Sequence, residues 1–346
     1  MNPTALIPAA QPIPVTWALF DGLLILGFWA HILLMNAVFG GGAIALVHSA
    51  GPGEPLSKQM SKKLPTMLAL TINFGVAPLL FLQVNYGHFD YPGTILMGGW
   101  WLLTIPALLV AYYSFYIWDF KYATLNGLRR VFLGLGLLSM LYVAFMFVNN
   151  MTLMLVPEHW AGYLENGGRS ILNLSDATLF PRFLHFMTGA LAIGGATVAV
   201  VGRWKGREDF ERIGLKWLMN GTLINMAFGL WFLIALPRQV LLAFMGGNAM
   251  ATGALVVSVI LAGLIVHATA VKNVRNGAIW AALTVLAMAV TRHMLRKLML
   301  EPYFSVQDLE VTGQYSPMVM FFVTLALGLL VIAWMIRLFL NSRKEA

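Results

Sequence analysis

The chain has 346 residues, of which 59% are hydrophobic and 10% are charged, and its mean hydropathy is +0.77. Soluble domains carry about 25% charged residues, so this composition excludes a soluble globular protein and indicates an integral membrane protein. The chain has no cysteine, which excludes disulfides, thiolate metal sites and covalent attachment of a c-type heme. The net charge of +8 is spread between apolar runs rather than gathered in one patch, so nucleic acid is not an expected partner.

Nine apolar runs are long enough to cross a membrane, because a helical span needs about 20 residues. These predicted spans cover residues 16–47, 65–86, 94–118, 131–155, 180–201, 213–236, 249–270, 278–299 and 317–340. No soluble linker, low-complexity tract or convincing repeat separates them. We therefore expect one domain over residues 1–346, an all-α bundle of nine spans. The start of the chain has no basic segment, so it is not expected to be a cleaved signal peptide.

Basic residues in the connections predict the orientation. With the N-terminus outside, 16 of the 22 basic residues fall on the cytoplasmic side. The positive-inside rule therefore predicts an outer N-terminus and a cytoplasmic C-terminus. Two outer segments, 157–176 and 301–317, are long enough to cover the outer face of the bundle or to dock a partner. The basic residues that fall outside are Arg169, Arg182, Arg238, Arg292, Arg296 and Lys297.

Three histidines lie within predicted spans, where an imidazole is costly and usually has a partner. His31 lies in the first span, His185 lies one turn into the fifth, and His293 lies near the outer end of the eighth. All three fall in the outer half of the predicted bundle, which is typical of a row of heme-iron ligands. The alternative is that they are polar residues that form hydrogen bonds between helices.

The surroundings of His185 favour a heme. Gly189 follows one turn later on the same face, and the small residues after it predict a flat helix surface for a porphyrin. Met250, at the outer start of the seventh span, lies at a similar depth and is a candidate second iron ligand. Because the chain has 20 methionines, a packing role is the alternative for Met250.

Arginines accompany two of these histidines. Arg182 precedes His185 by three residues, while Arg292 and Arg296 lie just before and one turn after His293. Guanidinium groups beside iron ligands can bind heme propionates in a bidentate manner. A snorkelling anchor at the membrane interface is the alternative for each arginine taken alone.

Three motifs resemble subunit I of cytochrome bd quinol oxidases. They are T-I-N-F-G-V-A-P-L-L-F-L-Q-V-N-Y-G at 71–87, R-F-L-H-F-M-T-G-A at 182–190 and W-A-H-I-L-L at 29–34. The order and spacing of the spans are also similar over nearly the whole chain. The resemblance implies a nine-span subunit of a bacterial or archaeal cytoplasmic membrane with hemes near the periplasmic side. In that family these are a low-spin heme b, a high-spin heme b and a heme d at which oxygen is reduced.

The resemblance also implies roles for single residues. His185 matches the histidine ligand of the low-spin heme b, and Met250 matches its methionine partner. His31 matches the first-span histidine that binds a heme of the oxygen site. His293 lies where it would replace or neighbour a carboxylate ligand.

Two departures from the family pattern argue against oxygen reduction. The third span of the oxidases carries glutamates for heme coordination and proton delivery, whereas residues 98–111 contain no ionisable side chain. The long quinol-binding loop between the sixth and seventh spans is also absent. We therefore expect two or three hemes b, held non-covalently, in a subunit that exchanges electrons between quinol or quinone and a periplasmic redox partner such as a c-type cytochrome.

Two other functions stay open at this point. One is a divergent quinol oxidase that keeps a heme d and receives protons through a second membrane subunit, and the other is a non-redox transporter or structural subunit. His88 and His159 are predicted in outer loops and are weaker candidates for contact with a propionate, a quinone headgroup or a partner. The polar neighbours of His88 rank it above His159, and the sequence does not locate the quinone site.

Overall fold

The computed structural model describes residues 3–50 and 54–345. Helices make up 83% of the structure and no strand forms within the described residues, where an isolated bridge joins Ile13 to Val311. Nine helices in this part of the chain are long and apolar enough to cross a membrane. The chain is therefore a multi-pass membrane protein, as its composition predicts.

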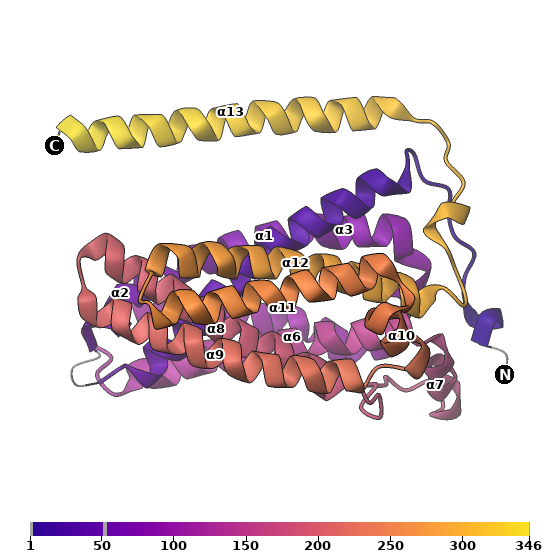
Figure 1. Cartoon of the computed structure of the whole chain (residues 1–346), viewed down its shortest axis with the longest axis horizontal. Coiled ribbons are helices and arrows are strands. Elements are labelled where there is room, and N and C mark those ends of the chain that lie inside the picture. Colours follow the sequence, from indigo (N-terminus) through magenta and orange to yellow (C-terminus); the bar gives the residue numbers. More distant parts are fainter. Residues whose placement is uncertain (1–2, 51–53, 346) are drawn as a thin grey trace.

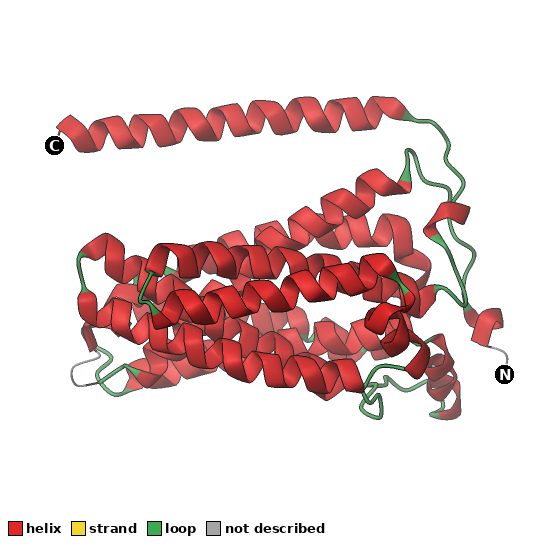
Figure 2. Cartoon of the chain, in the orientation of Figure 1, coloured by secondary structure: helices red, strands yellow, loops and turns green. Residues whose placement is uncertain are grey.

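The nine spans run alternately up and down the bundle (Figures 1 and 2). We call the end of the bundle where the first span begins the N-terminal face and the other end the opposite face. Short helices lie in the connections: η1 (Pro3–Leu6), α2 (Glu54–Ser61), η3 (Pro157–Trp160), α7 (Ala161–Glu165), α10 (Arg238–Leu242), η4 (Ala243–Gly247) and η5 (Val306–Asp308). The spans are α1 (Trp17–Val47), α3 (Leu64–Met97), α4 with α5 (Gly99–Leu102 and Thr104–Phe120), α6 (Leu128–Leu155), α8 (Leu179–Lys205), α9 (Glu208–Ile234), α11 (Ala249–Ala270), α12 (Val274–Leu300) and α13 (Tyr315–Glu345).

Helix α3 extends well beyond the predicted end at residue 86. It bends at Tyr86, where φ is −132° and ψ is 19°, and then continues to Met97. The carboxyl group of Asp90, after the bend, faces protein rather than water, because this residue is 1% exposed and accepts a hydrogen bond from Asn150 of α6. The prediction that His88 lies in an outer loop is therefore wrong, since the residue belongs to this helix. His159 likewise lies in a helical turn, η3, within the covering segment.

Helices α1 and α8 cross in direct backbone contact. A Cβ atom on Gly40 would overlap the carbonyl oxygen of Ala190, and a Cβ atom on Gly194 would overlap the backbone of Gly40. Small residues at such a crossing let two membrane helices approach closely enough for extensive van der Waals packing. Helix α1 is also tied to α12, because the indole N–H of Trp29 donates to the carbonyl oxygen of Ala282 at 2.9 Å.

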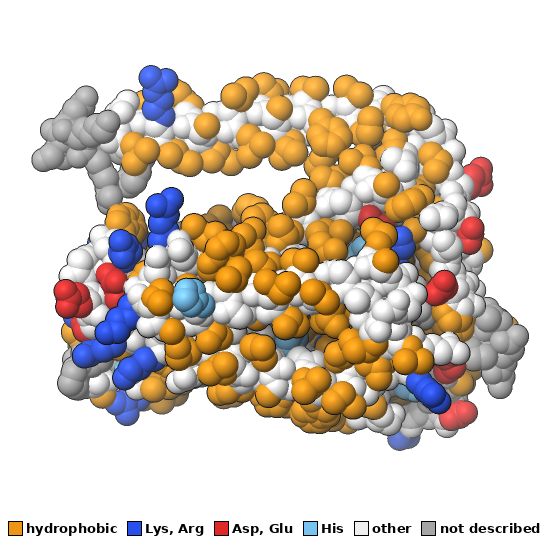
Figure 3. All heavy atoms as spheres, viewed as in Figure 1, with side chains coloured by type: hydrophobic (Ala, Val, Ile, Leu, Met, Phe, Trp, Pro, Cys, Tyr) orange, Lys and Arg blue, Asp and Glu red, His pale blue; other side chains and the backbone are white. Residues whose placement is uncertain are grey.

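Helix α13 stands apart from the other spans (Figures 1 and 3). It is the most apolar span, with a mean hydropathy of 2.7, and none of that window is buried. Its aromatic contact with the bundle joins Phe321 to Phe81 of α3, with ring centroids 6.3 Å apart. The bundle itself is therefore formed by the eight spans that precede α13.

The Gly40 crossing can be tested by adding one methyl group. Gly40→Ala is expected to lower the free energy of unfolding by about 3 kcal/mol, because the backbone of α8 leaves no room for a Cβ atom. Gly134→Ala is the matched control, since a Cβ atom there meets nothing within 4 Å. Thermal unfolding in detergent measures both variants, and equal melting temperatures would contradict the close crossing.

Candidate functional site

The ring of His31 is held between α1 and α3. Its Nδ1 lies 2.9 Å from the carbonyl oxygen of Thr71, and since a carbonyl can only accept, Nδ1 carries the proton and donates it. The ring packs on Gly75, where a Cβ atom would lie 2.8 Å from the imidazole Cε1. The neutral ring therefore keeps its free lone pair on Nε2, which is the atom that commonly binds a metal.

The ring of His185 is held in the same way between α8 and α9. Its Nδ1 donates to the carbonyl oxygen of Asn225 at 3.1 Å. Gly229 faces this ring, and a Cβ atom on it would lie 3.0 Å from Cε1. His185 therefore also presents an unprotonated Nε2, although it comes from a different pair of helices.

The two histidine pockets share the same local arrangement. In each, the accepting carbonyl lies four residues before the glycine that receives the ring. Gly40 follows His31 by nine residues, as Gly194 follows His185, so the two histidines lie at equal distances along their helices from the crossing. Neither this repeat nor the carbonyl and glycine partners of the rings was predicted from the sequence. The signal that was present is the Phe-Gly pair at 74–75 and again at 228–229.

Arg182, Arg292 and Arg296 form a cationic cluster near the N-terminal face. Arg182 and Arg296 are only 3% and 1% exposed, and the three guanidinium groups are close enough to repel one another. Each guanidinium group lies over an aromatic ring. The Cζ atom of Arg182 is 4.8 Å from the ring centroid of Phe232, that of Arg292 is 4.2 Å from Phe28, and that of Arg296 is 5.1 Å from Tyr86.

The guanidinium groups of this cluster form no direct ion pair. None of the three guanidinium groups forms an ion pair with a carboxylate of the described chain, and Nε of Arg182 together with Nε and Nη1 of Arg296 are buried without hydrogen-bond partners. A buried cation without a partner costs several kcal/mol. The cluster therefore has the donors and the charge to bind an anionic group such as a carboxylate.

His293 differs from the other two histidines. Its Nε2 lies 3.5 Å from Oδ2 of Asp21, whose Oδ1 accepts a hydrogen bond from Asn85 at 3.0 Å. The Nδ1 atom of His293 is buried and has no partner among the described residues. The structure thus places His293 beside a buried carboxylate that the sequence analysis did not include in the site. It does not show the free Nε2 that His31 and His185 share.

Two predicted contributors to the His185 site lie elsewhere or are covered. The side chain of Met250 is 74% exposed at the start of α11, and no contact joins it to His185. A Cβ atom on Gly189 would lie 3.5 Å from the side-chain amide nitrogen of Asn225. The helix face at Gly189 that we expected to be open for a porphyrin is therefore occupied by α9, which packs along α8.

The two weaker histidine candidates lie outside these clusters. The ring of His88 lies between Phe89 and Phe304, with centroids 4.5 and 4.4 Å away, and its Nε2 is buried without a partner. His159 donates from Nδ1 to the side-chain oxygen of Asn173 at 2.7 Å. Neither of these contacts includes a histidine or an arginine of the other clusters.

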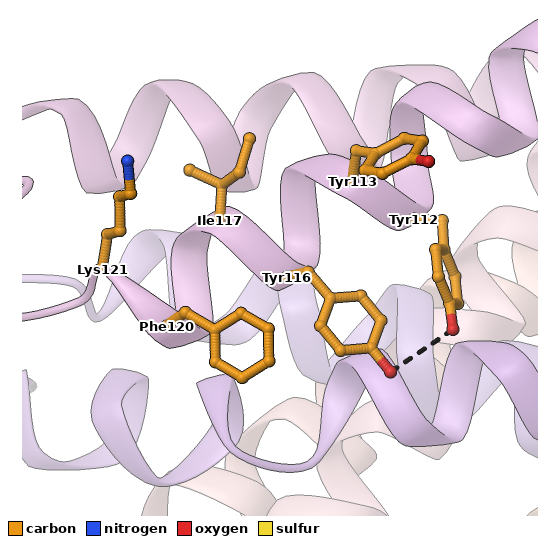
Figure 4. Close-up of a pocket in the computed structure, with 6 residues that line it drawn as sticks. All are labelled: Tyr112, Tyr113, Tyr116, Ile117, Phe120 and Lys121. Atoms are coloured by element: carbon orange, nitrogen blue, oxygen red, sulfur yellow. Dashed lines mark hydrogen bonds between the residues drawn. The ribbon is translucent and has the colours of Figure 1, made fainter.

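A surface hollow of about 350 Å³ lies on α5, away from these residues (Figure 4). It is lined by Tyr112, Tyr113, Tyr116, Ile117, Phe120 and Lys121, and the Tyr112 hydroxyl donates to that of Tyr116 at 3.3 Å. It contains no histidine or arginine, so it is not the candidate site. Among the described residues, no three His, Asp or Glu side chains come together in a way that would hold a metal ion.

No protein-family model matches this chain, and no curated protein sequence matches it. The assignment of the site therefore depends on the paired histidine pockets and the arginine cluster.

The unpaired arginines give a test that separates binding from folding. Arg182→Met is expected to leave the free energy of unfolding unchanged or to raise it by about 1 to 3 kcal/mol, because a buried charge without a direct ion pair is removed. Denaturation of protein prepared without cofactor measures this change. Arg207→Met, which alters an exposed arginine paired with Asp209, is the control. A clear loss of stability in Arg182→Met alone would mean that this arginine is needed for folding.

Proposed function

We propose that this protein is a heme b membrane subunit of a respiratory electron-transfer complex. It exchanges electrons between a quinol or quinone in the bilayer and a redox partner at the N-terminal face, such as a c-type cytochrome. The observation that carries the proposal is the repeated pocket in which His31 and His185 each donate from Nδ1 to a backbone carbonyl. The resemblance of the surrounding motifs to cytochrome bd subunit I supports it.

The hydrogen bond at Nδ1 suits an iron ligand. Metal-binding histidines almost always donate their second ring N–H to a carbonyl or carboxylate, which fixes the tautomer and the ring orientation and raises the basicity of the binding nitrogen. His31 and His185 both meet this condition, and a glycine beneath each ring fixes its position. Each would hold one heme iron through Nε2.

The arginine cluster suits the acidic side chains of the same cofactor. Heme propionates are carboxylates, and guanidinium groups bind carboxylates through two parallel hydrogen bonds. The free N–H groups of Arg182 and Arg296 are the donors that such a contact needs. Because the cluster combines residues of α8 and α12, propionate binding would also tie these two helices together.

Heme b supplies one-electron oxidation and reduction when it is bound, and the protein sets its potential through ligands, hydrogen bonds and burial. The carbonyl bonds of Thr71 and Asn225 and the charges of the three arginines are the groups of this chain that would act on that potential. The proposal does not use Met250, because its side chain is largely exposed.

The charge distribution supports an orientation. In Figure 3 most of the visible lysine and arginine side chains lie at the opposite face of the bundle. By the positive-inside rule we propose that this face is cytoplasmic and that the N-terminal face is periplasmic, in the cytoplasmic membrane of a bacterium or archaeon. The arginine cluster and His185 then lie toward the side where a periplasmic electron carrier would dock.

If each pocket holds its own heme, substituting one histidine should remove one heme and leave the other bound. His31→Ala and His185→Ala are each expected to remove one heme per chain, because each histidine would hold its own iron. A pyridine hemochrome assay counts the hemes, and His267→Ala, at an exposed position near the opposite face, is the control. Unchanged heme content in either variant would reject that ligand, and a wild-type protein without heme would reject the proposed function.

One observation keeps oxygen reduction as a second candidate function. The third span lacks acidic residues, but two other spans carry buried ones. Asp21 on α1 and Asp90 on α3 are both buried near the N-terminal face. Carbon monoxide distinguishes the two functions. Rapid binding by the reduced protein together with a heme d absorption band would favour an oxidase, whereas spectra of low-spin heme b that carbon monoxide leaves unchanged would favour electron transfer alone.

A further inference from the structure

The carboxyl group of Asp90 is buried at the junction of two spans and has only neutral hydrogen-bond partners. Its side chain is 1% exposed, beyond the bend of α3. Oδ2 accepts from the side-chain amide of Gln83 at 3.2 Å, and Oδ1 accepts from that of Asn150 at 3.0 Å. Of the charged side chains packed around it, Arg296 of α12 is the one close enough to act on it electrostatically.

These partners can serve both protonation states of the carboxyl group. In the arrangement shown, both amides donate, which suits a carboxylate. The side-chain oxygen of Asn150 is buried and has no partner. A half turn of this amide would exchange its oxygen and nitrogen, so that the oxygen accepts the O–H of a protonated Asp90. The site therefore keeps its hydrogen bonds when the proton arrives or leaves.

Polar groups next to Asn150 are joined by hydrogen bonds to the segment that covers the N-terminal face. Asn149, next to Asn150, accepts at its side-chain oxygen from the backbone N–H of Asn173 at 3.1 Å. The side-chain oxygen of Asn173 in turn accepts from His159, which is partly exposed. We call Asn150, Asn149, Asn173 and His159 the asparagine chain.

Buried polar atoms without partners lie on the asparagine chain and on His88, which precedes Asp90 by two residues in α3. Nδ2 of Asn149, Oδ1 of Asn150 and Nε2 of His88 are all buried without hydrogen-bond partners. Buried polar groups in proteins are nearly always paired, and ordered water is the usual partner where the protein supplies none. Water at the free atoms of Asn149 and Asn150 would bridge these two side-chain amides, which no direct hydrogen bond joins.

We propose that Asp90 binds and releases a proton and exchanges it with the aqueous phase at the N-terminal face through the asparagine chain. The step is a proton transfer alone: an O–H bond of a hydronium ion at the N-terminal face breaks and leaves water, and an O–H bond forms on the Asp90 carboxylate. This proposal stands on the geometry around Asp90 and does not need the heme assignment. In a subunit that oxidises quinol, the same path would give an exit to the protons that quinol releases.

Infrared spectroscopy tests the proton on Asp90 directly. In pH-difference spectra of the wild-type protein in lipid nanodiscs, a carboxylic C=O band that shifts in D2O is expected, and Asp90→Asn should lose it. The amide introduced by this substitution would keep the contacts to Gln83 and, after the half turn, to Asn150, so an unchanged melting temperature is expected. Asp119→Asn, on α5 near the opposite face, is the control and should retain the band. A band that persists in Asp90→Asn would overturn the proposal.

The asparagine chain is tested by the rate at which that band shifts after transfer to D2O. Asn173→Leu and, separately, His159→Phe are expected to slow the shift several-fold, while Asn166→Leu in the exposed part of the same segment should leave it unchanged. Equal rates in all four proteins would show that protons reach Asp90 by another route and would reject the path. Heme content, counted in the same samples, reports separately on the proposed function.

Discussion

The backbone contact between Gly40 and Gly194 is the constraint on which the site depends. It brings α1 and α8 together at one point, and each helix carries its histidine nine residues before that point. Helices rise about 1.5 Å per residue, so both rings lie roughly 14 Å from the crossing on the same side. A larger residue at either glycine would separate the helices and displace both pockets together.

Much of this fold could be predicted from hydrophobic runs, because transfer into lipid is what selects such segments. The nine spans follow from that pattern, and so does the choice of His31 and His185 as candidates. The pattern failed in 87–93, where polar residues suggest a loop although the side chain of Asp90 is buried against α6. The partners of the histidine rings were also missed, because a backbone carbonyl has no signature in the sequence.

The chain has few charged residues, but several of them lie close together in the structure. No ionisable residue lies in 98–111, which argued against proton chemistry. In the structure, however, Asp21, Asp90, His293 and the three arginines gather near one face. Such a cluster is costly inside a membrane unless it binds a ligand or moves a proton. The composition gives the number of charged residues, but whether they can bind a ligand or a proton depends on how close together the fold places them.

The isolation of α13 has a consequence for biosynthesis. Its described side chains bury no part of its apolar window, and the segment before it is joined to the N-terminal segment, where the N–H groups of Thr312 and Gln314 donate to the carbonyls of Ile13 and Pro14. The eight-helix bundle can therefore complete its packing while the last span is still being synthesised. Insertion of α13 then adds a membrane anchor to a bundle that has already formed. This long apolar helix is the last span to contact lipid.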